Sequence, residues 1–307
     1  MARCFAPAVC LCKQAAGAHH DNKTGQFVID YLRGVQRMKM YREVFSELRA
    51  ERRPALVPFF VIGDPNFDTS IAIVKTAIEA GADILELGIP FSDPIADGPT
   101  IQKADIRAMA GGMNVRKALE FVRKVKDFKD IPIGLLMYYN LIYQYGTEKF
   151  CGDFHRAGVN SILVADLSID DADEIIGPAV SAGLDTVFMV TPNTSPERMK
   201  RIAAKTTGFI YTVSVLGVTG SREKLSDTVG ELICKLKKLT SVPVCVGFGI
   251  SKAEHAAAVA RAGADGVIIG SKIVELIEAN LDNREKMLAE VSTFVREVKG
   301  AIGSQGE

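Results

Sequence analysis

A single carboxylate interrupts an apolar stretch at residues 84–87, which reads Ile-Leu-Glu-Leu. A run that is apolar on both faces is typical of a buried strand in a parallel sheet. A glutamate in such a strand is costly to desolvate unless a specific interaction or a chemical role holds it there. Glu86 is therefore a candidate for acid–base chemistry, and a satisfied structural carboxylate is the alternative.

Two further carboxylates follow in a loop at residues 88–99 that holds three prolines and two glycines. Asp97 lies eleven positions after Glu86, in a part of the loop that proline and glycine stiffen. Two acids placed on different elements can have separated pKa values and take opposite proton-transfer roles. Asp93 is predicted to be exposed and to make a surface contact rather than take part in catalysis.

Glycine-rich turns after two later apolar runs predict an anion site. They read Gly247-Phe248-Gly249 and Gly270-Ser271. Glycines let backbone N–H groups approach an anion, and the helix that follows adds partial positive charge. Two tight turns that need glycine for geometry alone are the alternative. A third glycine motif at 217–220 is predicted to form a mobile lid, and an ordinary long connection is its alternative.

The elements that must position these residues alternate between strand and helix. Strands are predicted at 56–62, 83–88, 132–137, 161–165, 186–190, 209–213, 244–246 and 266–269. Four helices end in Ala-Gly, where glycine supplies the left-handed conformation that closes the last turn. A βα unit repeated about eight times predicts an α/β protein with a closed (β/α)8 TIM barrel, and an open doubly wound sheet is the alternative.

This barrel is expected to carry an extra N-terminal helix at 41–51 and extra helices after strands two and eight. In a barrel the strand ends and the loops after them form one face, where chemistry gathers. That rule brings together the acids, the glycine turns and four more polar positions, namely Tyr138, Asn140, Asp166 and Tyr211.

Bulk composition narrows the class of protein. The 307 residues carry 37 basic and 37 acidic side chains, which gives no electrostatic footprint for nucleic acid or an anionic membrane. No apolar run approaches the roughly 20 residues of a membrane span. The six cysteines do not form a disulfide framework, so we infer a reducing compartment and a cytoplasmic location. The spacing of the cysteines and histidines matches no standard zinc module, so no metal site is expected.

Residues 1–37 differ from the rest because they lack a regular period. We expect them to form a poorly ordered N-terminal extension ahead of a TIM-barrel domain at 38–307. A transit peptide is one interpretation, and initiation at Met38 or Met40 is the other.

From about residue 41 to the C terminus the sequence resembles the α subunit of tryptophan synthase. The most specific segment is 85–102, which reads LELGIPFSDPIADGPTIQ. Further matches are Gly63-Asp64-Pro65, GLLMYYN at 134–140, LVADL at 163–167, GVTG at 217–220, GFGIS at 247–251 and GS at 270–271.

The resemblance implies retro-aldol cleavage of indole-3-glycerol phosphate to indole and D-glyceraldehyde 3-phosphate, in the last stage of L-tryptophan biosynthesis. It implies that Glu86 is the general acid/base and that Asp97 stabilises charge at the indole nitrogen. Thr219 corresponds to the lid residue that closes on that aspartate. The other implied substrate contacts are Tyr211, Gly220, Gly249, Gly270 and Ser271 near the phosphate and Phe59, Leu136, Leu163 and Phe248 around the indole, and we expect Gly247 and Tyr138 beside them.

In this family the barrel pairs with a pyridoxal-phosphate β subunit in an α2β2 complex, and indole passes to it directly. The loop with Pro90 and Asp93 corresponds to part of the contact surface, and the α chain itself needs no cofactor. Two positions depart from the family: Val215 stands where bacterial relatives commonly carry arginine, and Val61 where many carry threonine. The alternatives are a stand-alone lyase, a non-catalytic activator of the β subunit, and another phosphosugar barrel.

Overall fold

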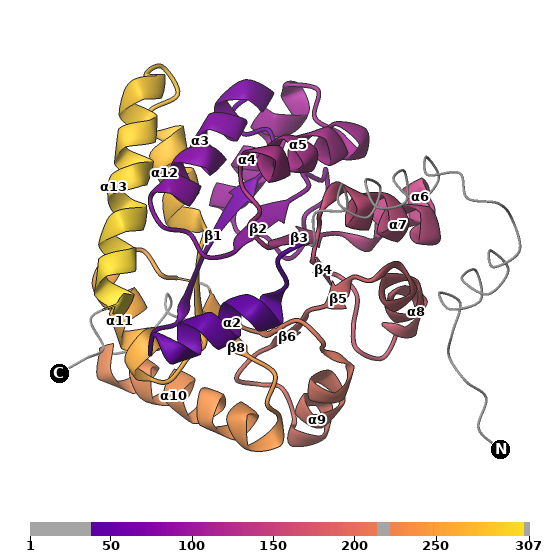
Figure 1. Cartoon of the computed structure of the whole chain (residues 1–307), viewed down its shortest axis with the longest axis vertical. Coiled ribbons are helices and arrows are strands. Elements are labelled where there is room, and N and C mark those ends of the chain that lie inside the picture. Colours follow the sequence, from indigo (N-terminus) through magenta and orange to yellow (C-terminus); the bar gives the residue numbers. More distant parts are fainter. Residues whose placement is uncertain (1–37, 214–221, 248, 304–307) are drawn as a thin grey trace, which may run out of the picture. The chain divides into compact units, whose positions relative to one another are not determined.

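The strands in the described part of the chain all run parallel and form one continuous sheet that curves into a barrel (Figure 1). The computed structural model describes residues 38–213, 222–247 and 249–303, so the predicted N-terminal extension lies outside the described part. The strands are β1 (Ala55–Val61), β2 (Leu85–Gly88), β3 (Ile133–Met137), β4 (Ser161–Val164), β5 (Asp185–Thr186), β6 (Phe188–Val190), β7 (Ile210–Val213), β8 (Val244–Gly247) and β9 (Gly266–Ile269). Their hydrogen-bonded order is β5-β4-β3-β2-β1-β9-β8-β7-β6.

The fifth barrel strand is split in two, and this split closes the barrel. Its first half, β5, pairs with β4, and its second half, β6, pairs with β7. Val187 lies between the halves and donates its backbone N–H to Ile162 O at 3.0 Å. Because β5 and β6 are consecutive in the chain, the two ends of the sheet meet on one strand. The closed eight-fold barrel is therefore confirmed over the open sheet.

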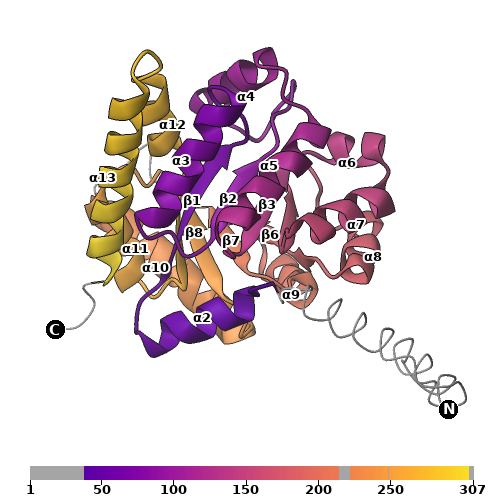
Figure 2. The same cartoon turned by 45° about the horizontal axis from the view of Figure 1, so that its top comes forward.

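Helices surround the strands on the outside (Figures 1 and 2). They are α2 (Tyr41–Ala50), α3 (Phe67–Glu79), α4 (Pro99–Ala110), α5 (Val115–Phe128), α6 (Tyr139–Tyr145), α7 (Thr147–Ala157), α8 (Asp173–Ala182), α9 (Pro196–Lys205), α10 (Arg222–Leu239), α11 (Ala253–Arg261), α12 (Ser271–Glu278) and α13 (Arg284–Gly303). The extra helices expected after strands two and eight are α4 and α12. A further extra helix, α6, follows β3 and was not predicted. None of the helices in the described ranges is long and apolar enough to cross a membrane.

The Ala-Gly helix ends have the expected geometry and a second role. Gly81, Gly158, Gly183 and Gly263 have φ angles of 111°, 104°, 90° and 93°, in the left-handed region. Three of these glycines are followed, two positions later, by a polar residue. Its side chain accepts a hydrogen bond from a backbone N–H at the start of the preceding strand. Asp83 accepts from Leu56 at 2.8 Å, Asn160 from Ile133 at 2.9 Å and Asp265 from Val244 at 2.9 Å. The repeated motif therefore ends a helix and fixes the neighbouring strand.

Helix α2 covers the amino-terminal end of the barrel (Figure 2). Tyr41 and Phe45 pack against Phe209, with ring centroids 5.6 and 6.5 Å from it. The Tyr41 hydroxyl also hydrogen-bonds Ser161 Oγ at 2.8 Å. These side chains form one buried cluster with residues such as Ile84, which directly precedes β2, and Ile268 of β9. The floor is thus packed with apolar groups, which leaves the carboxyl-terminal end of the strands as the open end.

Candidate active site

Glu86 is buried inside the barrel on β2, with 3% of its surface exposed. It lies in register between Phe59 of β1 and Gly134 of β3. Its Oε2 atom is buried and has no hydrogen-bond partner among the described residues. Burial, together with the nearby Asp97 charge, raises the pKa of Glu86 from 4.5 to about 8. Glu86 therefore carries a proton at neutral pH and can act as a general acid.

Asp97 is held by a tyrosine from the neighbouring strand end. Tyr138, which follows β3, donates its hydroxyl to Asp97 Oδ2 at 2.6 Å and accepts the Ala96 N–H at 3.1 Å. Burial raises the pKa of Asp97, and the Tyr138 hydrogen bond opposes that rise by stabilising the carboxylate. The Tyr138 ring stacks on Phe91, with centroids 5.1 Å apart. The loop after β2 therefore contacts Tyr138 twice, near its start through Phe91 and near its end through Asp97.

One cavity of about 330 Å³ joins the two acids to the predicted anion turns. Its lining includes eight residues expected at the substrate site, which are Phe59, Glu86, Asp97, Leu136, Tyr211, Gly249, Gly270 and Ser271. The acids come from β2 and the loop after it, whereas the glycine turns follow β8 and β9. A long ligand with an anionic group at one end can therefore lie across the barrel mouth.

Small residues let two aromatic rings stand in this cavity. A side chain on Gly88 or Gly270 would lie within 2.8 or 3.2 Å of the Phe59 ring. A side chain on Gly247 would fall against the Tyr211 hydroxyl. Gly247 therefore shapes the site through Tyr211 and is absent from the cavity lining. Ser271 begins α12, with Gly270 as its N-cap, so the N-terminal N–H groups of that helix are available at the cavity.

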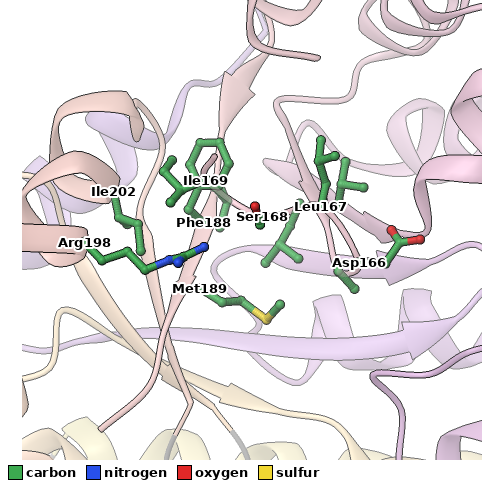
Figure 3. Close-up of a pocket in the computed structure, with 12 residues that line it drawn as sticks. Asp166, Leu167, Ser168, Ile169, Phe188, Met189, Arg198 and Ile202 are labelled. Carbon is green, nitrogen blue, oxygen red and sulfur yellow. The ribbon is translucent and has the colours of Figure 1, made fainter. Parts of the chain in front are cut away.

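A second cavity, of about 270 Å³, lies at the ends of β4 and β6 (Figure 3). It contains Leu163, which was expected around the indole, together with Phe188 and Met189. In Figure 3 the Asp166 carboxylate turns away from the other labelled side chains, and it accepts the Tyr139 N–H at 2.8 Å. Leu163 therefore lies at the barrel mouth but outside the cavity of the two acids.

Four of the predicted positions, Thr219, Gly220, Phe248 and the departure Val215, fall outside the described residues. The other departure, Val61, is buried in β1. Of the expected partner contacts, Asp93 is exposed and Pro90 is buried within the chain. Between these positions and Asp97, Ile95 is 83% exposed, which is unusual for a large apolar side chain.

Three polar residues near the site were missed from the sequence. Lys272 and His255 line the cavity beside the glycine turns. The Nδ1 atom of His255 is buried and has no partner in the described ranges. Asp105 lies on the buried face of α4. Sequence signals for the first two existed, since Lys272 follows the Gly-Ser motif and His255 lies in the first turn of the helix after the Gly-Phe-Gly turn. No cluster of three or more candidate metal ligands occurs among the described residues.

Comparisons with known proteins agree with this geometry. The family model described as "Tryptophan synthase alpha chain" matches residues 45–303. The tryptophan synthase alpha chain of Methanothermobacter thermautotrophicus is 48% identical over 250 residues, covering 81% of this chain and 93% of its own. That of Methanocaldococcus jannaschii is 46% identical over 241 residues, covering 78% and 85%.

Solved structures give the same result. The Legionella pneumophila tryptophan synthase subunit alpha superposes with a TM-score of 0.79 at 32% identity, covering 85% of this chain and 97% of its own. A chain of Mycobacterium tuberculosis tryptophan synthase superposes with a TM-score of 0.76 at 32% identity, covering 86% and 98%. The family model spans the barrel, and these relatives match this chain along most of their own length. The chain therefore belongs to the tryptophan synthase alpha chain family.

Proposed function

We infer that this chain is the carbon–carbon lyase of tryptophan biosynthesis that cleaves indole-3-glycerol phosphate into indole and D-glyceraldehyde 3-phosphate. Family membership supports this activity. The observation that carries the site assignment is the shared cavity, in which a buried, protonated Glu86 and Asp97 lie at one side and glycine turns at the other. The residue roles that follow are our proposal.

Glu86 begins the reaction as an acid. Indole is a poor leaving group until its C3 atom, which bears the glycerol chain, is protonated. A neutral Glu86 donates this proton, and the resulting carboxylate then takes the proton of the hydroxyl on the adjacent glycerol carbon. The bond between C3 and that carbon breaks, its electron pair returns to the ring, and the hydroxyl carbon becomes the aldehyde. Glu86 ends with the proton it received, so the cycle is balanced.

Asp97 is proposed to stabilise the positive charge that develops on the indole ring. Protonation at C3 places positive charge on the indole nitrogen, and a carboxylate near that nitrogen stabilises it. Tyr138 supports this role because its hydrogen bond favours the ionised form of Asp97. The ionised Asp97 in turn raises the pKa of Glu86. The two acids therefore hold opposite protonation states, as their opposite roles require.

The phosphate end of the substrate is proposed to lie at Gly249, Gly270 and Ser271, where the α12 N-terminus meets the cavity. This grip is equal before and during bond cleavage, so it contributes to substrate binding more than to the chemical step. Proton transfers at Glu86 and charge stabilisation by Asp97 account for the whole reaction. We therefore propose that the chain needs no cofactor and no metal of its own.

Replacement of each acid by its amide tests these roles. Glu86→Gln and Asp97→Asn each lower kcat for indole release by about 10² to 10⁴, with KM changed far less. Glu79→Gln and Asp127→Asn, which make the same chemical changes at exposed positions, keep wild-type rates. Near-wild-type cleavage by either site variant would exclude the role assigned to that acid. If the wild-type chain itself cleaved no substrate, the chain would instead be interpreted as a non-catalytic activator of the β subunit.

We propose that the chain works with a tryptophan synthase β subunit in an α2β2 complex and passes indole to it. Exposed Asp93 and Ile95 in the loop after β2 support this, since an exposed apolar side chain beside a catalytic loop fits a partner surface. Indole release with and without a β subunit separates a partner-dependent lyase from a stand-alone one. A cytoplasmic location is also proposed, supported by free thiols at the three described cysteines.

A further inference from the structure

Asp105 is a buried acid that the proposed chemistry does not use. It lies on α4 between Ile101 and Ala108, which face the core, and only 4% of its surface is exposed. Its Oδ2 atom is buried and has no hydrogen-bond partner among the described residues. A buried carboxyl with an unsatisfied oxygen is costly, so its presence beside the active-site loop calls for an explanation.

The neighbouring acid Asp64 shows by contrast what Asp105 lacks. Asp64, in the loop after β1, accepts two hydrogen bonds from Arg107, at 2.7 and 3.0 Å. No ion pair to Asp105 occurs in the described part of the chain. Burial, followed by the charges of Asp97 and Asp64, raises the pKa of Asp105 to about 8. Asp105 is therefore neutral at pH 7, both because it is buried and because two other acids lie near it.

A short series of contacts leads from Asp105 to Asp97. The backbone N–H of Phe91 donates toward the Asp105 carboxyl. The Phe91 ring stacks on Tyr138 at an interplanar angle of 24°. Tyr138 then donates to Asp97 at 2.6 Å. Asp105, on the helix that follows the loop, thus contacts Phe91 near the start of that loop.

We propose that Asp105 is a positioning residue, which fixes Phe91 at the start of the loop and, through the stack on Tyr138, holds the Asp97 carboxylate at the cavity. This inference rests on the proposed function of Asp97. The neutral form of Asp105 does this work, because an ionised carboxylate would repel Asp97 and Asp64 in a buried space. The groups that face it are those two acids and Tyr138, with Arg107 already engaged by Asp64.

Two replacements separate positioning from folding. Asp105→Asn keeps an acceptor for the Phe91 N–H and mimics the neutral acid, so kcat at pH 7 stays within about twofold of wild type. Asp105→Leu keeps the size but offers no acceptor, so kcat falls about tenfold or more while KM changes little. The leucine variant removes the buried carboxyl with its unsatisfied Oδ2 but also the acceptor of the Phe91 N–H, so these two effects oppose each other and the unfolding temperature stays close to that of wild type. A merely structural residue would show lower stability together with lower activity.

The pH profile gives a second readout. Between about pH 8 and 9 the wild-type kcat depends on two protonated acids, Glu86 and Asp105, so log kcat falls with a slope steeper than −1 over that range. Asp105→Asn leaves one such acid, and the slope becomes about −1. Asp127→Asn, the exposed control, keeps the wild-type slope. Equal slopes in wild type and Asp105→Asn, or full activity in Asp105→Leu, would overturn the proposal.

A measurement without turnover keeps this test independent of the proposed function. The Asp97 carboxyl can be followed by ¹³C NMR in protein labelled at aspartate. Its signal and titration shift in Asp105→Leu and stay close to wild type in Asp105→Asn if Asp105 positions the loop. Failure of the proposed function instead appears as a wild-type chain that releases no indole, whatever the state of Asp105.

Discussion

The hydroxyl of Tyr138 donates a 2.6 Å hydrogen bond to Oδ2 of Asp97, which joins the end of β3 to the loop after β2. A hydrogen bond to a carboxylate favours the ionised form and orients the oxygen that accepts it. In the proposed reaction Asp97 must be ionised and aimed at the indole nitrogen. On the proposed mechanism, Tyr138 serves catalysis through Asp97 and needs no contact of its own with the substrate.

Tyr138→Phe tests this relationship. The variant loses the hydrogen bond that lowers the pKa of Asp97, so that pKa rises further above its usual value. We expect kcat at pH 7 to fall about tenfold, and the acid limb of the kcat profile to move to higher pH. Tyr143→Phe, at a tyrosine that is 66% exposed, leaves both unchanged. An acid limb that stays in place would show that Tyr138 does not tune Asp97.

The raised pKa of Glu86 predicts that this residue destabilises the fold as pH rises. In the folded chain the pKa is about 8, against 4.5 for the ordinary carboxyl, so the folded state holds a proton that the unfolded state releases. The free energy of unfolding therefore falls as pH rises from about 4.5 to about 8. Below that window the group makes no such difference.

Glu86→Gln removes this pH-dependent loss. We expect the variant to be more stable than wild type at pH 7 and to gain more at pH 8, with a much smaller difference at pH 4.5. Urea unfolding at the three pH values measures the effect. Glu79→Gln, at an exposed position, should follow the wild-type curve throughout. A variant that loses stability at pH 8 would contradict a protonated Glu86.

We expect the positive charge of Lys272 to contribute to binding of the substrate phosphate. Its ammonium group lies 3.5 Å from Glu275 Oε2, and both side chains line the cavity with His255. An ion pair this loose leaves the lysine able to turn toward a bound phosphate. Because the contact would be equal before and during cleavage, Lys272→Ala should raise KM severalfold with kcat nearly unchanged.

Inorganic phosphate provides a direct check on that site. As a competitive inhibitor it should bind more weakly to Lys272→Ala than to wild type, whereas Lys238→Ala, at an exposed position on α10, should not differ. Indole-3-glycerol without its phosphate should be cleaved at similar kcat/KM by all three proteins. A lysine effect that persists with this substrate would place Lys272 elsewhere in the mechanism.

The barrel and its two main acids were predictable because each leaves a local mark in the sequence. Glu86 interrupts an apolar strand, and the Ala-Gly ends recur at each of four helices. The split of strand five at Val187 leaves no such mark, because it depends on the registers of both neighbouring strands. Helix α6 was missed because it is short and three of its seven residues are tyrosines, which favour strands as much as helices.

Asp105 shows why burial on a helix is harder to predict. A sequence pattern assigns apolar residues to the core, yet on α4 Asp105 is buried and its neighbour Ile106 is 63% exposed. The phase of this helix follows from its contacts with β1, with α12 and with Asp64 in the loop after β1, which lie far from it in sequence. The roles of Thr219, Gly220 and Phe248 stay predictions, since they fall outside the described residues.

We predict that a β subunit binds at the loop after β2. Ile95 exposes 83% of its surface only two residues from Asp97, and Asp93 is exposed beside it. Contact with a partner would bury Ile95 and restrain the loop that carries Asp97, so binding and catalysis should be coupled. Ile95→Asp should weaken β binding at least tenfold, because it places a charge in an apolar contact.

Indole release by Ile95→Asp without the β subunit should match wild type, since Ile95 is exposed and is not among the residues that line the cavity. Stimulation by the β subunit should then require a correspondingly higher concentration of it, which titration calorimetry and the activity assay can both measure. Val180→Asp, at an exposed apolar residue on α8, provides the matched control and should bind normally. If Ile95→Asp binds the β subunit as tightly as wild type, the contact surface lies elsewhere on the barrel rim.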